Sequence, residues 1–246
     1  MKKIISILVL PLILISCGKG YQEPPFGGMN GKVERVTASH HEPEIWHAGS
    51  RETDVYFMTA SAYDMYGNEI CSAKMDSAGR IQSEAENIFD NGICLRSTQK
   101  SNGHILVQLV FRSAKKNILE YDKSYSGKTV RMTVRKTSWG RNYKSVVTED
   151  GTVTTISKIK TDKSGFPEVI TITDVQNDKT TVERNVFDER HNIVEKHRSV
   201  QGEQEDEVSY IRYFDFDEYG NWREARIFNK NHLPTEVILR EIEYWE

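Results

Sequence analysis

Two pairs of acidic residues are the side chains best suited by type to hydrolytic chemistry. Asp188 and Glu189 are adjacent, and Asp215 and Asp217 are separated by one residue. A glycosidase needs two carboxyl groups about 5–10 Å apart across a sugar site. The sequence contains no nucleophile elbow, phosphate-binding loop, zinc-protease motif or dinucleotide-binding glycine motif. A glycan-acting hydrolase using a carboxylate pair is therefore the alternative to a non-enzymatic protein.

A histidine-rich segment holds the densest set of potential metal ligands. Its members are His40, His41, Glu42, Glu44 and His47. In a strand, His40 and Glu42 would share one face while His41 points to the other, and Pro43 would interrupt the hydrogen-bond ladder. The spacing matches no zinc motif. We interpret the segment as polar surface, and we expect no metal, no cofactor and no catalytic residue in this chain.

Two cysteines, Cys71 and Cys94, each follow a glycine turn. Cys71 comes four residues after Gly67, and Cys94 comes two residues after Gly92. The equal parity would put both side chains on corresponding faces of neighbouring hairpins. A disulfide closing a loop of about twenty residues would contribute roughly 3 kcal/mol. Two separately buried thiols are the alternative, and the sequence leaves both open.

Residues 131–144 form a basic segment that also contains aromatic residues. Trp139, Arg141 and Tyr143 form its tip. Aromatic faces stack on sugars as well as on bases, but a formal net charge of −3 provides no basic footprint for nucleic acid. The segment is either a solvated hairpin whose Trp139 covers the end of the core or a surface that contacts anionic glycan or membrane. We expect no nucleic-acid partner.

The composition favours strands over helices. After residue 16 the chain has 18 Val, 16 Ile and 17 Thr, but only 6 Leu and 9 Ala. β-branched residues fit pleated sheets, whereas Leu and Ala favour helices. Residues 104–111 and 129–135 alternate with period two, and Asp150-Gly151 between two β-branched runs predicts a hairpin. We predict an all-β fold with antiparallel strands, ending in a strand within residues 236–246.

One turn pattern recurs along the chain. An aromatic or apolar residue is followed by Asp or Asn, then polar residues, then Gly or a substitute for Gly. Copies begin at residues 63, 75, 89, 161, 187, 216 and 228. The Asp side chain should accept backbone N–H bonds of its own turn, and the Gly should adopt the positive φ that closes it. His191 and His232 replace Gly in two copies.

These copies resemble the YD (Rhs-type) repeat family. The match is closest at Tyr63-Asp64 with Gly67-Asn68, and at Asp217 with Gly220-Asn221. Residues 93–155 contain no clear copy. The resemblance implies an antiparallel sheet of stacked hairpins, in a single layer or partly closed, and it implies no catalytic residue.

The first residues are similar to a bacterial lipoprotein signal peptide. Lys2 and Lys3 precede an apolar run, residues 4–15, that is too short for a good membrane span. Leu14-Ile15-Ser16-Cys17 resembles the lipobox, which implies lipid on Cys17, and Gly18 in place of Asp implies the outer membrane. Residues 1–16 are then the signal peptide, 17–31 a flexible tether and 32–246 the all-β domain.

Hydropathy narrows the function classes further. A mean hydropathy of −0.59 excludes a protein with several apolar membrane helices. The sequence therefore predicts a cell-envelope protein held at the outer membrane by lipid on Cys17, facing the periplasm or the surface. Its function is a non-enzymatic binding or scaffold module, with a glycan or an envelope protein as partner.

Overall fold

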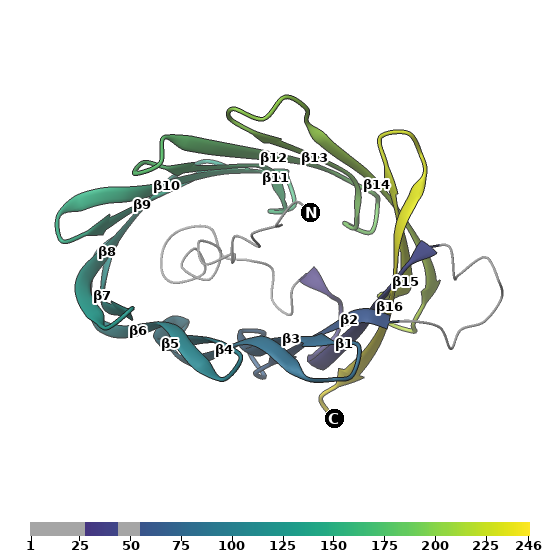
Figure 1. Ribbon diagram of the computed structural model, residues 1–246, viewed down its shortest axis with the longest axis horizontal. Helices are drawn as coiled ribbons and strands as arrows, with labels where there is room; N and C mark the ends of the chain where they lie inside the picture. The colour runs from purple at the N-terminus through teal and green to yellow at the C-terminus, as the bar shows by residue number, and fades with distance from the viewer. Residues whose placement is uncertain (1–27, 44–54) are drawn as a thin grey trace.

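The fold is a closed antiparallel β-barrel. The computed structural model describes residues 28–43 and 55–246. In these residues sixteen strands form one sheet, in which each strand pairs with its neighbours in sequence and β16 pairs with β1 (Figure 1). The strands are β1 (Val33–His41), β2 (Val55–Tyr63), β3 (Glu69–Asp76), β4 (Ile81–Asp90), β5 (Ile93–Ser101), β6 (His104–Lys115), β7 (Ile118–Tyr125), β8 (Lys128–Trp139), β9 (Asn142–Glu149), β10 (Thr152–Thr161), β11 (Pro167–Asp174), β12 (Lys179–Phe187), β13 (Ile193–Val200), β14 (Glu207–Phe216), β15 (Trp222–Asn229) and β16 (Pro234–Tyr244).

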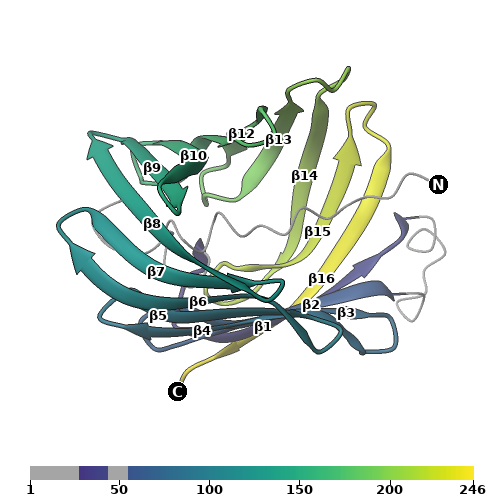
Figure 2. The same ribbon diagram turned by 60° about the vertical axis from the view of Figure 1, so that its left-hand side comes forward.

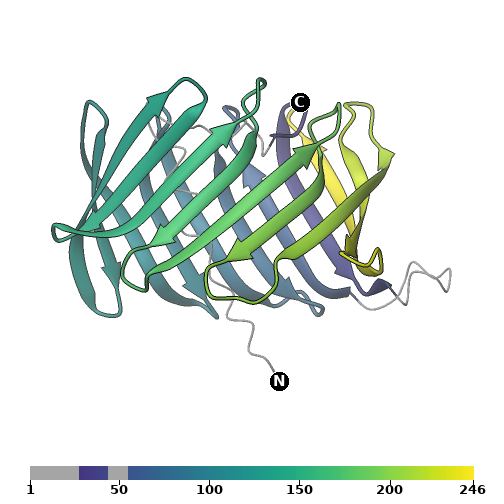
Figure 3. The same ribbon diagram turned by 90° about the horizontal axis from the view of Figure 1, so that it is seen from above.

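Barrel closure depends on the first and last strands. Arg35 pairs with Glu243 at one end of the seam, and His41 pairs with Val237 at the other. The predicted final strand is thus confirmed as β16, and it hydrogen-bonds to β1. The sheet is closed, whereas the sequence predicted a single layer or partial closure. The difference arises because pairing between strands about 200 residues apart leaves no local pattern. The strands incline to the barrel axis, as closure requires (Figure 3).

The barrel is elongated in cross-section. In Figure 1 the sheet bends sharply around β7 and β8, and again near β14 to β16. Figure 2 shows the hairpins projecting at the two open ends. Among residues 28–43 and 55–246, no helix is long and apolar enough to cross a bilayer.

Cross-strand register identifies the inward face. Leu119 pairs with Val134, which pairs with Val147. These residues belong to a buried cluster drawn from five successive strands, and side chains of five strands can converge only on the concave side of a sheet. The cluster comprises Cys94, Leu109, Leu119, Tyr121, Met132, Val134 and Val147. The same face, followed pair by pair, passes through Ile159 and Ile170.

The outward face is rich in charge. On β7 and β8, Glu120, Asp122 and Arg131 alternate with the buried cluster residues. Arg131 Nη1 lies 3.5 Å from Glu120 Oε2, and its Nε lies 3.7 Å from Asp122 Oδ1. Outward charged residues continue around the sheet as Glu84, Glu86, Arg96, Lys100, Arg135, Lys144, Lys158, Arg184, Glu195, Arg212, Glu224 and Arg226. Charged side chains thus occupy outward positions on most strands, beside exposed apolar side chains such as Ile88, Val110 and Phe214.

Six of the seven recurrent turns have the predicted hydrogen bonds, whereas the copy at residue 89 forms a two-residue Asn91-Gly92 turn in which the Asp90 carboxylate accepts the Asn91 side-chain amide instead. Asp64 Oδ1 accepts the N–H groups of Tyr66 and Asn68, both at 2.9 Å. The same two-bond pattern occurs at Asp76, Asp162, Asp188, Asp217 and Asn229. His191 and His232 adopt the positive φ of the glycines they replace, 65° and 58°. The carboxylates are therefore occupied by turn formation.

Residues 93–155 form hairpins without the repeat pattern. Asp150-Gly151 joins β9 to β10 as predicted, with φ angles of 46° and 86°. Asn102-Gly103 and Ser126-Gly127 have the same pair of positive φ angles. Such turns match the twist of antiparallel strands. The barrel therefore continues evenly through a region where the YD resemblance ends.

The Asp217 turn provides a test of these caps. Burial alone would raise the pKa of Asp217, but hydrogen bonds from the Tyr244 hydroxyl and from the N–H groups of Asn221 and Tyr219 outweigh it and hold that pKa below its ordinary value. Asp217→Asn should lower the free energy of unfolding by about 1–2 kcal/mol at pH 7, since partial hydration moderates the loss.

The pH dependence of that effect has a definite sign. A carboxyl group with a lowered folded pKa stabilises the fold above its unfolded pKa of about 3.9, and the contribution disappears as pH falls through the folded value. The difference between wild type and Asp217→Asn should therefore shrink between pH 5 and pH 3 in urea unfolding. Glu218→Gln, at an exposed position in the same turn, serves as control. A difference independent of pH would contradict the cap.

Candidate functional site

One rim of the barrel gathers the two ends of the described chain and seven hairpin turns. The turns after β2, β4, β6, β8, β10, β12 and β14 lie there, together with residues 28–32 and Trp245. We call this the amino-terminal rim. Trp245 N–H donates to the Lys32 carbonyl oxygen at 2.9 Å. The first described residue, Gly28, therefore lies at this rim; Cys17 lies outside the described residues.

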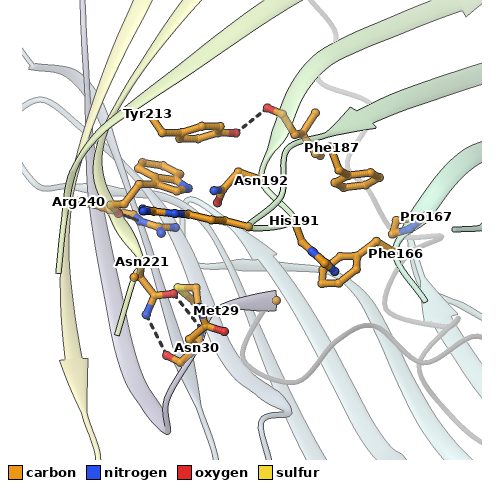
Figure 4. A pocket seen from close by; sticks show the side chains of 15 residues that line it. Met29, Asn30, Phe166, Pro167, Phe187, His191, Asn192, Tyr213, Asn221 and Arg240 are labelled. Atoms are coloured by element: carbon orange, nitrogen blue, oxygen red, sulfur yellow. Dashed lines mark hydrogen bonds between the residues drawn. The ribbon is translucent and has the colours of Figure 1, made fainter. Parts of the chain in front are cut away.

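A cavity of about 390 Å³ opens at this rim, on the inward face. It is large enough for a small molecule or a saccharide ring. Its wall comes from the turns after β10, β12 and β14, from the adjoining ends or interiors of strands β11 to β16, and from the segment before β1 (Figure 4). The side chains of the wall are Met29, Asn30, Phe166, Pro167, Phe187, Arg190, His191, Asn192, Ile193, Tyr213, Asn221, Trp222 and Arg240.

Arg240 is the most constrained cation of this wall. Its guanidinium carbon lies 3.5 Å from the centroid of the Trp222 ring, and its Nε donates to the Trp222 carbonyl oxygen at 2.5 Å. Burial lowers the pKa of Arg240 to about 10, so it remains charged at neutral pH. Tyr213 packs beside Trp222 with ring centroids 5.1 Å apart, and its hydroxyl donates to the Ile193 carbonyl oxygen at 2.8 Å. These contacts hold the guanidinium in one orientation.

Aromatic rings form the opposite side of the cavity. Phe166 meets the His191 ring edge-on, with centroids 4.4 Å apart, and lies 5.7 Å from Phe187. Figure 4 places Asn192 between Arg240 and this aromatic group. Arg190 contributes a second guanidinium, which lies 4.3 Å from the Phe216 ring. The wall therefore combines apolar rings, amides and two cations.

The segment before β1 is fastened to the cavity. Asn221 pairs with the Asn30 backbone in both directions: its Oδ1 accepts the Asn30 N–H and its Nδ2 donates to the Asn30 carbonyl oxygen, both at 2.8 Å. Gly31 has a φ of 79°, and a Cβ there would approach the rings of Tyr219 and Tyr244 to 3.1 Å. Residues 28–31, the end of the predicted flexible tether, thus lie against the barrel.

The predicted hydrolytic acids are not assembled into a buried pair. Asp188 and Asp217 accept the N–H bonds of their own turns. Glu189 lines an adjoining open hollow of about 670 Å³ with Glu218, and both side chains are exposed. A glycosidase acid needs a dry environment that raises its pKa. In the described residues, the 390 Å³ cavity has no carboxylate in its wall.

A titratable cluster lies at the opposite rim. His40 Nδ1 and Glu236 Oε1 are 2.6 Å apart, and the Tyr56 hydroxyl donates to the same oxygen at 2.8 Å. These contacts join β1, β2 and β16 across the seam. Of the histidine-rich segment, Glu44 and His47 lie outside the described residues. Within the described ones, no three His, Cys, Asp or Glu side chains are placed to hold a metal ion.

The two cysteines are separate thiols in the structure. Cys71 pairs with Glu86 on the outward face, whereas Cys94 belongs to the inward cluster. A bulge in β5 reverses the parity that the sequence indicated. The thiols thus lie on opposite faces of the sheet, and the alternative of two separate thiols describes them.

The predicted aromatic tip is divided between the two faces. Trp139 is 55% exposed at the end of β8, where it pairs with Asn142. Tyr143 pairs with Ser138 and packs inward against Ile159 and Ile170. Arg141 is exposed in the turn between them. Trp139, Arg141 and Tyr143 therefore do not form one surface.

No sequence pattern identified the cavity residues as a site. Phe166, His191 and Asn221 belong to the repeat turns, whose regular spacing was the only signal for them. Tyr213, Trp222 and Arg240 come from three different strands. Nothing in their local sequence marks them, because the closed register is what brings them together.

Comparison with one solved structure supports this class of fold. A porin-like protein from Bacteroides uniformis aligns with a TM-score of 0.50 and 8% identity, over 87% of this chain and 99% of that chain. A porin-like protein from Bacteroides vulgatus aligns with a TM-score of 0.44 and 11% identity, over 87% and 98%. No family model and no curated protein sequence matches the chain. The fold is that of a porin-like, closed antiparallel barrel.

Proposed function

We propose that this chain is a lipid-anchored protein of the cell envelope whose barrel stands in water and binds a ligand at its amino-terminal rim without catalysing a reaction. Lipid on Cys17 holds it at the outer membrane. The observation that carries the binding function is the cavity whose wall joins aromatic rings, amides and two guanidinium groups. This refines the general expectation of a binding or scaffold module to a particular place in the fold.

The outward charges support a barrel in water. A barrel that crosses a bilayer presents an apolar band about 25 Å tall, and each Arg or Lys at the midplane costs roughly 2–4 kcal/mol. Here Arg212 and Arg226 pair with each other near the middle of β14 and β15, and Arg135 lies in the interior of β8, all at outward positions. Met132 and Val134, which a bilayer would accept, face inward instead. Such a barrel would be attached to the membrane by its lipid anchor and would not be inserted into the bilayer.

The occupied turn acids support the absence of catalysis. Asp188 and Asp217 belong to the acid pairs that the sequence indicated, and each accepts two backbone N–H bonds, as the turn residues Asp64 and Asp76 also do. A carboxylate held in this way is neither free to protonate a leaving group nor placed to attack. The hydrolase alternative therefore keeps no favoured pair.

Ligand screening tests the proposal. The mature Cys17→Ala protein is melted with peptidoglycan fragments, lipopolysaccharide-derived oligosaccharides and simple saccharides. A ligand at 100 times its Kd should stabilise the fold by about 2.7 kcal/mol, which raises the melting temperature by about 5–10 °C. Phe166→Ala, in the cavity, should abolish the shift, and Trp139→Ala should preserve it.

The opposite results are also defined. Mass spectrometry of the recovered ligand should show it unchanged, and a cleaved product would refute the non-enzymatic assignment. A panel without any stabilising compound would refute the binding function. A shift lost in Trp139→Ala but kept in Phe166→Ala would move the binding site to the exposed hairpin and refute the proposed cavity.

A further inference from the structure

The charge balance of the cavity points to the class of ligand. Arg240 and Arg190 line the cavity, and no described carboxylate lies within ion-pair distance of either guanidinium. Six other described arginines are paired with acids, as Arg131 is with Glu120. Charged groups removed from water are stabilised by an opposite charge. The cavity is therefore cationic and has room for an anion.

The nearest acid does not neutralise Arg240. Asp217 acts on it only through space, because the Asp217 carboxylate already accepts the Tyr244 hydroxyl and the N–H groups of Tyr219 and Asn221. The Arg240 Nε is committed to the Trp222 carbonyl oxygen. A guanidinium has five N–H donors. The four on its two terminal nitrogens have no hydrogen-bond acceptor among the described residues, and they can bind a carboxylate or phosphate with two parallel bonds.

The rest of the wall suits a ring. Phe166, Phe187 and Tyr213 offer apolar surface, and the carbon–hydrogen faces of a saccharide pack on such rings. His191 and the side-chain amide of Asn192 lie among them (Figure 4). The imidazole can donate to and accept from hydroxyl groups, and the Asn192 Oδ1 can accept from them, while its Nδ2 already donates to Asp188. The volume of about 390 Å³ matches one or two rings.

We propose that this cavity binds an acidic saccharide, a sugar ring carrying a carboxylate or phosphate, with Arg240 as the anion-binding group and Arg190 as its partner at the mouth. The inference deepens the proposed function and rests on it. The acid group meets the two guanidinium groups while the ring packs against Phe166 and Tyr213.

The position of the amino-terminal rim relative to the membrane leaves two sources for the acidic sugar. Gly28 lies only eleven residues after Cys17. An extended chain spans at most about 3.6 Å per residue, so a lipid on Cys17 would keep the cavity within ~40 Å of the bilayer. The acidic sugar or phosphate can therefore belong to a membrane lipid headgroup or to a free oligosaccharide.

Titration calorimetry with simple probes tests the ligand class. The mature Cys17→Ala protein is titrated with glucuronic acid, glucose 6-phosphate and glucose. The two acidic sugars should bind saturably, and glucose should bind at least 10-fold more weakly. Arg240→Gln should weaken the acidic sugars 10- to 100-fold, and Arg190→Gln should weaken them about 3- to 10-fold. Arg212→Gln is the matched control, because Arg212 also stacks on an aromatic ring, 5.1 Å from Phe228, but on the outward face.

A second arm separates the sources. If the protein binds phosphatidylglycerol vesicles and glucose 6-phosphate competes with that binding, the natural ligand is a lipid headgroup. If the protein binds the free acidic sugars but not the vesicles, the natural ligand is an oligosaccharide. Vesicle binding that survives Arg240→Gln and Arg190→Gln arises elsewhere and overturns the inference. Arg190→Gln, at an exposed position, keeps the test valid if Arg240→Gln fails to fold.

The remaining outcomes separate this inference from the proposed function. Equal affinity for glucose and the acidic sugars would overturn the acidic class while leaving a saccharide-binding module. No binding of the three sugars, together with a stabilising ligand of another class in the screen, would overturn the inference alone. An effect of Arg212→Gln equal to that of Arg240→Gln would show general electrostatic attraction and would also overturn it.

Discussion

When an ordinary secretory signal peptide replaces residues 1–16, cells that express Cys17→Ala should release the processed protein into the aqueous fraction, whereas the wild-type chain with its own signal remains with the membranes. Each buried CH₂ of an acyl chain contributes about 0.8 kcal/mol, so two or three chains attach the wild-type protein firmly. Without the acyl chains the barrel should not stay in the membrane fraction, because the outward Arg131, Lys144 and Lys158 interrupt any apolar belt around it. Ultracentrifugation and labelling with a palmitate analogue measure the two fractions.

The control for this experiment is another cysteine. Cys71→Ala should remain in the membrane fraction and keep its label, because Cys71 lies in β3. Cys17→Ala protein that resists extraction at alkaline pH and needs detergent would show that the barrel itself inserts into lipid. Equal labelling of Cys17→Ala and wild type would contradict the lipid on Cys17.

Met132→Ala should lower the free energy of unfolding by about 2–5 kcal/mol, the range for large-to-small substitutions in packed cores. Met132 is 1% exposed and belongs to the inward cluster that lines the sharp bend at β7 and β8. Its loss leaves a cavity where side chains of five strands meet. Urea unfolding of the mature Cys17→Ala protein measures the change.

Arg131→Ala is the matched control on the same strand. Arg131 points outward, and its ion pairs with Glu120 and Asp122 are partly exposed. Such pairs contribute at most about 1 kcal/mol. The ratio of the two effects therefore reports which face of the sheet is the packed one. A larger loss for Arg131→Ala than for Met132→Ala would mean that the barrel has the opposite polarity.

The turns show how much of the fold was accessible from sequence. An Asp that caps its own turn and a Gly at positive φ are local requirements, so Asp64, Asp217 and even His191 at a Gly position were predictable. The Asp150-Gly151 hairpin was predictable for the same reason. Antiparallel pairing of consecutive strands followed from these turns and from the alternation between them.

Predictions of which face of the sheet a side chain occupies were wrong where the hydrogen-bond ladder between strands is irregular. The expectation for Cys71 and Cys94 assumed two uninterrupted strands, but the bulge in β5 inserts a residue that moves Cys94 to the inward face. Trp139 and Tyr143 were treated as one tip, although they occupy opposite faces of the β8–β9 hairpin. A one-residue change of register exchanges the two faces of a sheet, and no local pattern signals it.

The sequence by itself determined the strand composition, the capped turns and the order of pairing, since each depends on residues a few positions apart. It also contains the lipobox-like end at Cys17, which stays a prediction. Only the tertiary structure decided that β16 returns to β1, which face is inward, and that Arg240, Tyr213 and Phe166 share one cavity. Those properties depend on the accumulated twist and register of sixteen strands in the described residues. Each hairpin contributes a small part of the twist that closes the barrel, so the sequence of a single segment does not predict the closure.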